Sequence, residues 1–196
     1  PADAEVDFGG AMVFPAFVDA HTHLDKGHIW PRTPNPAGTF VGALTSVGED
    51  RAASWSAEDV RARAEFALRC AYAHGTRMIR THLDSIAPQT GISWPLFREL
   101  RAEWAGRIEL QMVCLCGIEA VDDTPEWRDL AQVVAEAGGV LGTVTYPVDD
   151  LDRRLDLFFD TAARHGLAAD FHADETMDPA AESLRAIAAS VARTGF

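Results

Sequence analysis

"FVDAHTHLDKGHIW", residues 17–30, joins an apolar run to a group of histidines. The apolar, β-branched and aromatic content before the histidines predicts a buried strand over residues 13–20. His21 and His23 come directly after it, and alternation along a strand places both side chains on the same side. Two such imidazoles are a suitable bite for one divalent metal ion. Two hydrogen-bonded or solvent-facing histidines would leave the same pattern.

Strand and helix patterns alternate along the rest of the chain. Ser56 as an N-cap, with Glu58 and Asp59 in the first turn, predicts a helix that ends at Gly75. Four further strands are predicted at residues 76–83, 107–115, 140–146 and 167–172. Each is followed by a predicted helix, at residues 94–104, 125–137, 149–165 and 179–193 respectively. Residues 31–48, rich in Pro, Gly and Thr, are predicted as a long loop.

A repeat of roughly thirty residues is the size of a parallel βα unit. The fold class is therefore α/β, with a parallel sheet covered by helices, either as an open sheet or as a (β/α)8 barrel of the TIM type. Chemically capable residues follow every strand: His21 and His23, His82 and Asp84, Cys116 and Gly117, Thr145 and Tyr146, His172 and Glu175. Several strand ends converging on one mouth favour the barrel.

His172 ends the fifth predicted strand, and Glu175 follows three residues later. In a barrel, strand five would bring His172 across to His21 and His23. Taken alone, His172 is more simply interpreted as a hydrogen-bonded core or rim histidine. Glu175 alone reads equally as a carboxylate that meets the dipole of a helix N-terminus.

Together these segments resemble the cytosine deaminase-like branch of the amidohydrolase superfamily. The resemblance extends from about Gly10 to the end of the chain. Its strongest part is the HTHLDK string joined to RTHLD and to a strand that ends in HxxE. The segments that carry it, in order, are FVDAHTHLDKGHIW, GTRMIRTHLD, IELQMV, GGVLGTVT and DFHADET.

The resemblance implies a (β/α)8 barrel with a small β-sandwich built from both termini, and one divalent metal ion, Zn or Fe. It implies that His21, His23 and His172 are metal ligands and that Glu175 is the proton shuttle. In such a reaction a water activated by the metal attacks the carbon that bears the leaving amine. Glu175 would move a proton from that water to a ring nitrogen.

The family also uses a histidine from strand six and an aspartate from strand eight, which would lie beyond Phe196. We therefore expect residues 13–196 to be about the first five βα units of a barrel in a longer polypeptide. Residues 1–12 are expected to be the end of the β-sandwich. A partial parallel sheet would expose unpaired strand edges.

The expected substrate pocket departs from the cytosine deaminase pattern. Those enzymes resemble one another in carrying a glutamine after strand three, where this chain has Gly117. A glycine offers no amide, so cytosine would lose a hydrogen-bonding partner. An isocytosine-like pyrimidine, a purine or a triazine stays open as the substrate. Lys26, Asp84 and Trp30 are further candidate substrate-binding residues, with rim ion pairs and simple loop packing as the alternatives.

Amino-acid composition limits the binding partners and the cellular location that we expect. The net charge of −13 argues against binding to nucleic acid or to an anionic membrane surface. Three cysteines without framework spacing argue against a disulfide-stapled secreted domain. Neither a signal peptide nor a membrane-length apolar run is recognised, so a cytoplasmic protein is expected.

The leading hypothesis is thus a metal-dependent hydrolytic deaminase of an N-heterocyclic small molecule. A second hypothesis keeps the hydrolase but changes the bond, to a cyclic amide or an N-alkylamino group. A third is a non-catalytic partial barrel that acts by association. A homo-oligomer is expected only from the family resemblance.

Overall fold

The structure is a computed structural model, and it describes residues 4–196. Five parallel strands alternate with helices, as predicted. Their bounds are β1 Phe17–Thr22, β2 Thr76–Asp84, β3 Glu109–Leu115, β4 Leu141–Thr145 and β5 Ala169–Ala173. The helices are α1 Phe40–Ser54, α2 Ala57–Ala73, α3 Gln89–Glu103, α4 Pro125–Glu136, α5 Leu151–His165 and α6 Ser183–Thr194, with a short 3-10 helix, η1 Ile118–Ala120.

The strands follow one another in chain order. β1, β2 and β3 form one sheet, and β4 and β5 form a second. Parallel bridges Val113–Val140 and Gly117–Val144 join β3 to β4, so the strand order is β1-β2-β3-β4-β5. Because every pairing is parallel, all five C-terminal strand ends lie at the same edge. This confirms the α/β class with parallel sheets.

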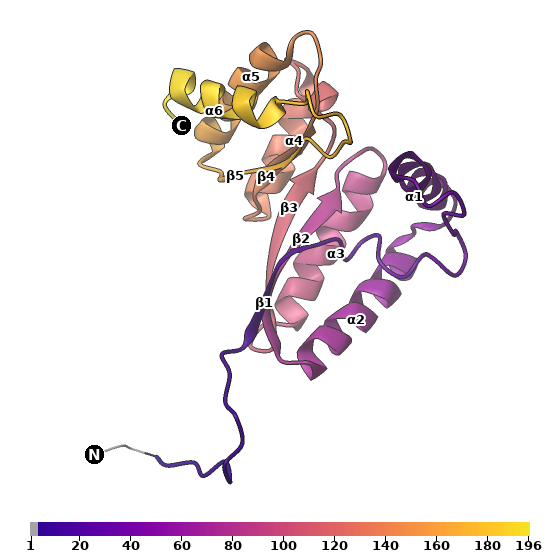
Figure 1. Ribbon diagram of the computed structural model, residues 1–196, viewed down its shortest axis with the longest axis vertical. Helices are drawn as coiled ribbons and strands as arrows, with labels where there is room; N and C mark the ends of the chain where they lie inside the picture. Colours follow the sequence, from indigo (N-terminus) through magenta and orange to yellow (C-terminus); the bar gives the residue numbers. More distant parts are fainter. Residues whose placement is uncertain (1–3) are drawn as a thin grey trace.

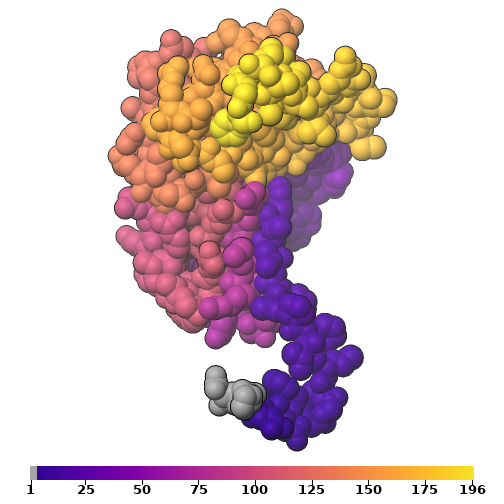
Figure 2. Space-filling view, turned by 90° about the vertical axis from the view of Figure 1, so that its left-hand side faces the viewer, coloured from indigo at the N-terminus to yellow at the C-terminus, as the bar shows by residue number. Residues whose placement is uncertain are grey.

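The hydrophobic core lies between the helices and the strands. It is centred on fully buried side chains such as Leu68 of α2, Trp94 and Phe97 of α3, and Phe158 of α5. Figure 1 shows α2 and α3 running alongside β1 and β2. The segment before β1 extends away from the rest of the chain (Figures 1 and 2).

Helix termini follow the predicted signals closely. Ser56 accepts a hydrogen bond from the Asp59 N–H and so caps α2, as predicted. The helices α2, α4, α5 and α6 are each followed by a glycine with positive φ, at Gly75, Gly138, Gly166 and Gly195. A left-handed backbone costs glycine nothing, which is why these positions end helices.

The predicted loop over residues 31–48 is wrong in its second half, where α1 begins at Phe40. Thr39 caps this helix by accepting from the Gly42 N–H at 3.0 Å. Two glycines and a β-branched threonine give the segment a low helix propensity. Contacts with distant residues stabilise the helix instead, and these are not visible in the local sequence.

Other boundaries shift by a few residues. β1 begins at Phe17 rather than at residue 13, because its partner β2 begins at Thr76, directly opposite Phe17. α3 begins at Gln89 and contains Pro95, while α6 begins at Ser183 rather than at residue 179. Of the expected β-sandwich tail, residues 1–3 lie outside the described residues and residues 4–12 form no strand. The sandwich assignment therefore stays a prediction.

No helix in the described range 4–196 is both long and apolar enough to cross a membrane.

Candidate metal and catalytic centre

Four histidines meet at the C-terminal ends of the strands. His21 and His23 come from the end of β1, His82 from β2 and His172 from β5, and one nitrogen of each lies within 4.8 Å of the others. The ring centroid of His21 is 4.6 Å from that of His172. The three histidines singled out in the sequence thus come together, and His82 joins them.

The protonation state of His23 and His172 suits metal binding. Burial, followed by the charge of Lys26, lowers the pKa of His23 to about 3. Burial, followed by neighbouring His82, lowers the pKa of His172 to about 4. Both imidazoles are therefore neutral near pH 7 and have a lone pair available, which is the form that binds metals.

The spacing of two of these nitrogens also fits a shared ion. Nε2 of His23 and Nε2 of His172 are 3.5 Å apart. Two nitrogen ligands of one tetrahedral zinc ion, each about 2.05 Å from it, would be about 3.3 Å apart. The donor set and this distance therefore fit a single divalent ion held by His21, His23 and His172.

His82 has a different role in the cluster. Its Nε2 lies 3.0 Å from Oδ1 of Asp170, and its Nδ1 lies 3.3 Å from the carbonyl oxygen of Thr22. A neutral imidazole carries one N–H, so at most one of these two contacts is a donated hydrogen bond. The contact with Asp170 ties His82 to β5 and so positions it to support the other histidines.

Asp170 links three strands beneath the histidines. Besides His82 of β2, it accepts from Arg80 at 2.6 Å, and Arg80 also donates to Gln111 of β3 at 2.7 Å. The bond from His82 helps to lower the pKa of Asp170 despite its burial. The sequence analysis did not single out Asp170. Its position two residues before His172, on the same face of β5, was the available signal.

Glu175 lies in the loop between β5 and α6. Its neighbour Asp174 accepts from the backbone N–H groups of Ser183 and Leu184, at 2.8 and 3.0 Å. Asp174 therefore caps α6 from nine residues away and sets where this helix begins. His172 and Asp174 both precede Glu175, so these contacts fix the chain on the N-terminal side of Glu175.

Lys26 and Asp84 form an ion pair with each other. The sequence analysis gave such a pair as the alternative to substrate binding by Lys26. Nζ of Lys26 is 2.5 Å from Asp84, and Arg51 of α1 contacts the other carboxylate oxygen at 2.6 Å. The Asp84 N–H donates to the buried carboxylate of Asp25 at 2.7 Å. Burial, followed by the charge of Asp84, raises the pKa of Asp25 to about 7. These contacts join the loop after β1 to the end of β2 and to α1.

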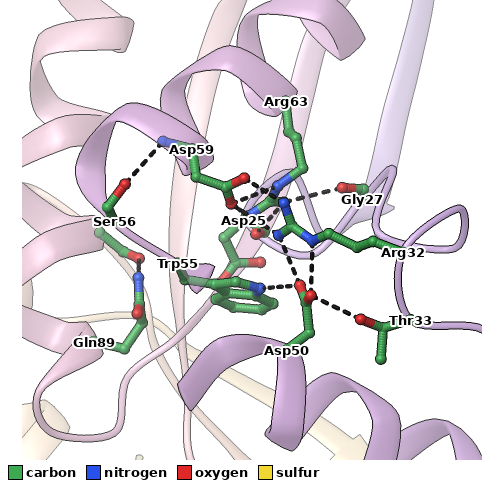
Figure 3. A network of polar contacts seen from close by, with 11 residues as sticks. Asp25, Gly27, Arg32, Thr33, Asp50, Trp55, Ser56, Asp59, Arg63 and Gln89 are labelled. Atoms are coloured by element: carbon green, nitrogen blue, oxygen red, sulfur yellow. Dashed lines mark hydrogen bonds and ion pairs between the residues drawn. The ribbon is translucent and has the colours of Figure 1, made fainter. Parts of the chain in front are cut away.

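A second polar network, shown in Figure 3, also holds the loop that follows β1. Arg32 donates to both carboxylate oxygens of Asp50, at 2.7 and 2.8 Å, and contacts Asp59 at 2.5 Å. Asp50 also accepts from Trp55 at 2.7 Å and from Thr33 at 2.8 Å. Paired Arg–carboxylate bonds of this kind are among the stronger polar contacts in proteins.

Arg63 of α2 completes the network. It contacts Asp59 and donates to the carbonyl oxygens of Asp25, at 2.7 Å, and Gly27, at 2.9 Å. Those two carbonyls flank Lys26. The backbone of Lys26 is thus held by α2 while its side chain is held by Asp84.

Asp50→Asn is expected to destabilise the fold by about 2 kcal/mol at pH 7, because the bonds from Arg32 lower the pKa of Asp50 to about 2. Since the folded-state pKa lies below the ordinary value, this stability is present above about pH 4 and is lost as the pH falls towards 2. Urea unfolding at pH 7 and pH 3 would measure it. Asp129→Asn, at an exposed carboxylate, is the control. Equal stabilities for wild type and Asp50→Asn at pH 7 would contradict the prediction.

A cavity of about 380 Å³ adjoins the histidines. His23, His172, Lys26 and Glu175 line one part of it, and apolar side chains line the rest. Much of the apolar wall comes from α1, the helix that the sequence did not predict, through Phe40, Ala43, Leu44 and Val47. The cavity therefore combines a few convergent polar groups with an apolar cover, as ligand sites generally do.

Two other candidate residues lie outside this cavity. Trp30 does not line it, and 62% of this residue is exposed. Gly117 lines an adjoining cavity of about 640 Å³, together with Glu119, Cys116 and Trp127. The structure does not bring Trp30 to the histidines, and it places Gly117 at the next cavity.

Comparison with known proteins finds deaminases and a related aminohydrolase. No protein-family model matches the sequence. The chain is 53% identical, over its whole length, to a pterin deaminase of Rhizobium rhizogenes, of which it covers 45%. It superposes on a 5-methylcytosine deaminase of Klebsiella pneumoniae with a TM-score of 0.80 and 27% identity, covering all of this chain and 49% of that one.

A third likeness is to the N-isopropylammelide isopropylaminohydrolase of Burkholderia multivorans. Its TM-score is 0.73 at 28% identity, over 98% of this chain and 51% of that one. The chain therefore spans about half the length of the relatives it matches. These likenesses support the resemblance of the chain to the cytosine deaminase-like branch of the amidohydrolase superfamily.

Proposed function

We propose that this chain forms the first part of a metal-dependent hydrolase that deaminates an N-heterocyclic small molecule. The observation that carries the proposal is the convergence of His21, His23 and His172 beside a cavity that also contains Glu175. Metal-ligating nitrogens, a carboxylate and an enclosed apolar wall are the parts that hydrolysis of a ring C–N bond requires.

His21, His23 and His172 would hold one divalent ion, zinc or iron. Such an ion supplies an activated water near neutral pH. Asp170 is hydrogen-bonded to His82, whose ring packs against those of His21 and His172 at centroid distances of 4.3 and 4.7 Å. The apolar side chains of α1 limit access of bulk water to the same space.

Glu175 would carry the proton in this site. An amine leaves poorly unless the ring is protonated, so a carboxylate that moves a proton to a ring nitrogen lowers the barrier. Lys26 lines the same cavity, and its ammonium could meet a carbonyl oxygen of the substrate. Its ion pair with Asp84 holds it at the cavity wall.

The parallel strand order supports five βα units of a (β/α)8 barrel as the architecture. On this proposal, the remaining ligand and the general base come from later strands of a longer polypeptide. The chain's match to only about half of each relative agrees with it.

The 53% sequence identity to the pterin deaminase favours a pterin-like bicyclic ring as the substrate class. A second candidate is hydrolysis of an N-alkylamino group, which the likeness to the isopropylaminohydrolase favours. Both reactions break a C–N bond at a ring carbon, so product mass separates them.

The test uses the complete polypeptide that contains this chain, loaded with zinc or iron. Ammonia release is measured with pterin, isocytosine, cytosine, a purine and an aminotriazine, with an N-alkylaminotriazine as the probe for the second reaction. We expect ammonia from pterin and a product mass that corresponds to exchange of an amine for oxygen. Absence of ammonia from the whole panel would exclude deamination.

A further inference from the structure

Gly117 lies where neighbouring side chains, and not its own backbone conformation, limit the room for a Cβ. Its φ of −69° and ψ of 154° are accessible to any residue. A Cβ at this position would lie 2.7 Å from Oε2 of Glu119 and 3.1 Å from the hydroxyl oxygen of Tyr146. The side chains of Glu119 and Tyr146 thus occupy the space that a longer side chain at position 117 would fill.

Glu119 and Tyr146 are bonded to each other across two strand ends. The Tyr146 hydroxyl donates to Oε2 of Glu119, and parallel pairing of Gly117 with Val144 brings the two segments together. Burial, followed by the bond to Glu119, raises the pKa of the Tyr146 hydroxyl, so it remains a donor. Within residues 4–196, Oε1 of Glu119 has no hydrogen-bonding partner.

The backbone that carries Glu119 is held firmly. Arg154 of α5 donates to the carbonyl oxygens of Glu119, at 2.8 Å, and Val121, at 3.0 Å. A fixed backbone and a hydrogen bond from Tyr146 leave one carboxylate oxygen as a positioned acceptor. Fixed polar groups of this kind supply specificity in ligand sites.

The pair stands at the border between the two cavities. Tyr146 lines the cavity of about 380 Å³ beside His23 and His172. Glu119 and Gly117 line the adjoining cavity of about 640 Å³. Because Glu119 does not line the cavity at the histidines, a ligand seated there would reach Glu119 with a part that extends past Tyr146. A single six-membered ring would have less reach than a bicyclic or substituted one.

We infer that Glu119, oriented by Tyr146 in the space left by Gly117, determines substrate specificity by accepting a hydrogen bond from the part of the heterocycle remote from the leaving amine. This inference rests on the proposed deaminase function. A carboxylate accepts only, so it selects a ring N–H or a hydroxyl-bearing substituent. A substrate without such a donor lacks this bond and gains no affinity from the exposed carboxylate of Glu119.

The test compares substrates that differ in one donor, with the complete metal-loaded protein. The pair is 6-hydroxymethylpterin and 6-methylpterin, and the variants are Glu119→Gln, Tyr146→Phe and Gly117→Ala. We expect wild type to prefer the hydroxylated pterin at least about 10-fold in kcat/KM, mainly through KM. We expect each variant to reduce this preference to about 3-fold or less. A preference that is absent in wild type, or unchanged in Glu119→Gln, would overturn the inference.

A binding measurement separates this inference from the proposed function. Pterin fluorescence reports binding to the metal-loaded Glu175→Gln protein without turnover. Suppose that wild type releases no ammonia, but that the Glu175→Gln protein binds the hydroxylated pterin more tightly than the double variant Glu175→Gln/Glu119→Gln does. The proposed deamination would then be wrong, and the role of Glu119 in binding would stand. If ammonia is released but the two proteins bind both pterins with equal selectivity, only the role of Glu119 is wrong.

Discussion

His172→Ala in the complete polypeptide is expected to remove the bound metal and, with it, the hydrolytic activity. His172 is only 6% exposed, and its Nε2 lies 3.5 Å from that of His23. Loss of one of the three nitrogen ligands should weaken metal binding by at least about 100-fold. We expect kcat/KM to fall by about 1,000-fold or more. Metal content after dialysis and the rate of ammonia release measure the two effects.

The matched control is His74→Ala, which removes an exposed histidine at the end of α2. This variant should keep both its metal and its rate. Far-UV circular dichroism of both variants would show whether the fold is retained. A His172→Ala protein that keeps a full complement of metal and its activity would refute the assignment of His172 as a ligand.

Glu175→Gln is expected to leave metal binding intact and to lower kcat by about 100- to 10,000-fold. Glutamine keeps the size and polarity of the side chain but cannot carry the proton. Because Glu175 lies in a loop anchored by Asp174 and not in the packed core, the substitution should not disturb the fold. Steady-state kinetics with metal content determined on the same sample would measure the effect.

Glu182→Gln is the control for this substitution. Glu182 is an exposed carboxylate in the same loop, paired only with Arg185 at 2.8 Å in the described structure. Its replacement should change kcat by less than about 2-fold. A loss of less than about 10-fold in Glu175→Gln would show that another group carries the proton.

Most predictions that depended on local signals agree with the structure, although the loop predicted over residues 31–48 is a helix from Phe40 onward. Alternation of strand and helix patterns fixed the α/β class, and the glycines after α2, α4, α5 and α6 all have the left-handed backbone that ends a helix. The grouping of His21, His23 and His172 also followed, because alternation and strand ends together determine which side chains meet at one edge of a parallel sheet.

Features that depend on distant pairs were not predicted. Helix α1 has a weak sequence pattern and is held by the bonds of Asp50 to Arg32 and of Arg51 to Asp84. His82 and Asp170 are 88 residues apart in the sequence. No periodicity within one segment reports such a contact.

The sequence by itself therefore determined the class of fold, and it singled out three candidate metal ligands and the carboxylate of Glu175. The tertiary structure decided the wall of the cavity, the support of the histidines by Asp170, and the filling of the space at Gly117 by Glu119 and Tyr146. The reason is physical: hydrophobic period, capping and backbone conformation act within a few residues, whereas a cavity is enclosed by side chains that only folding brings together.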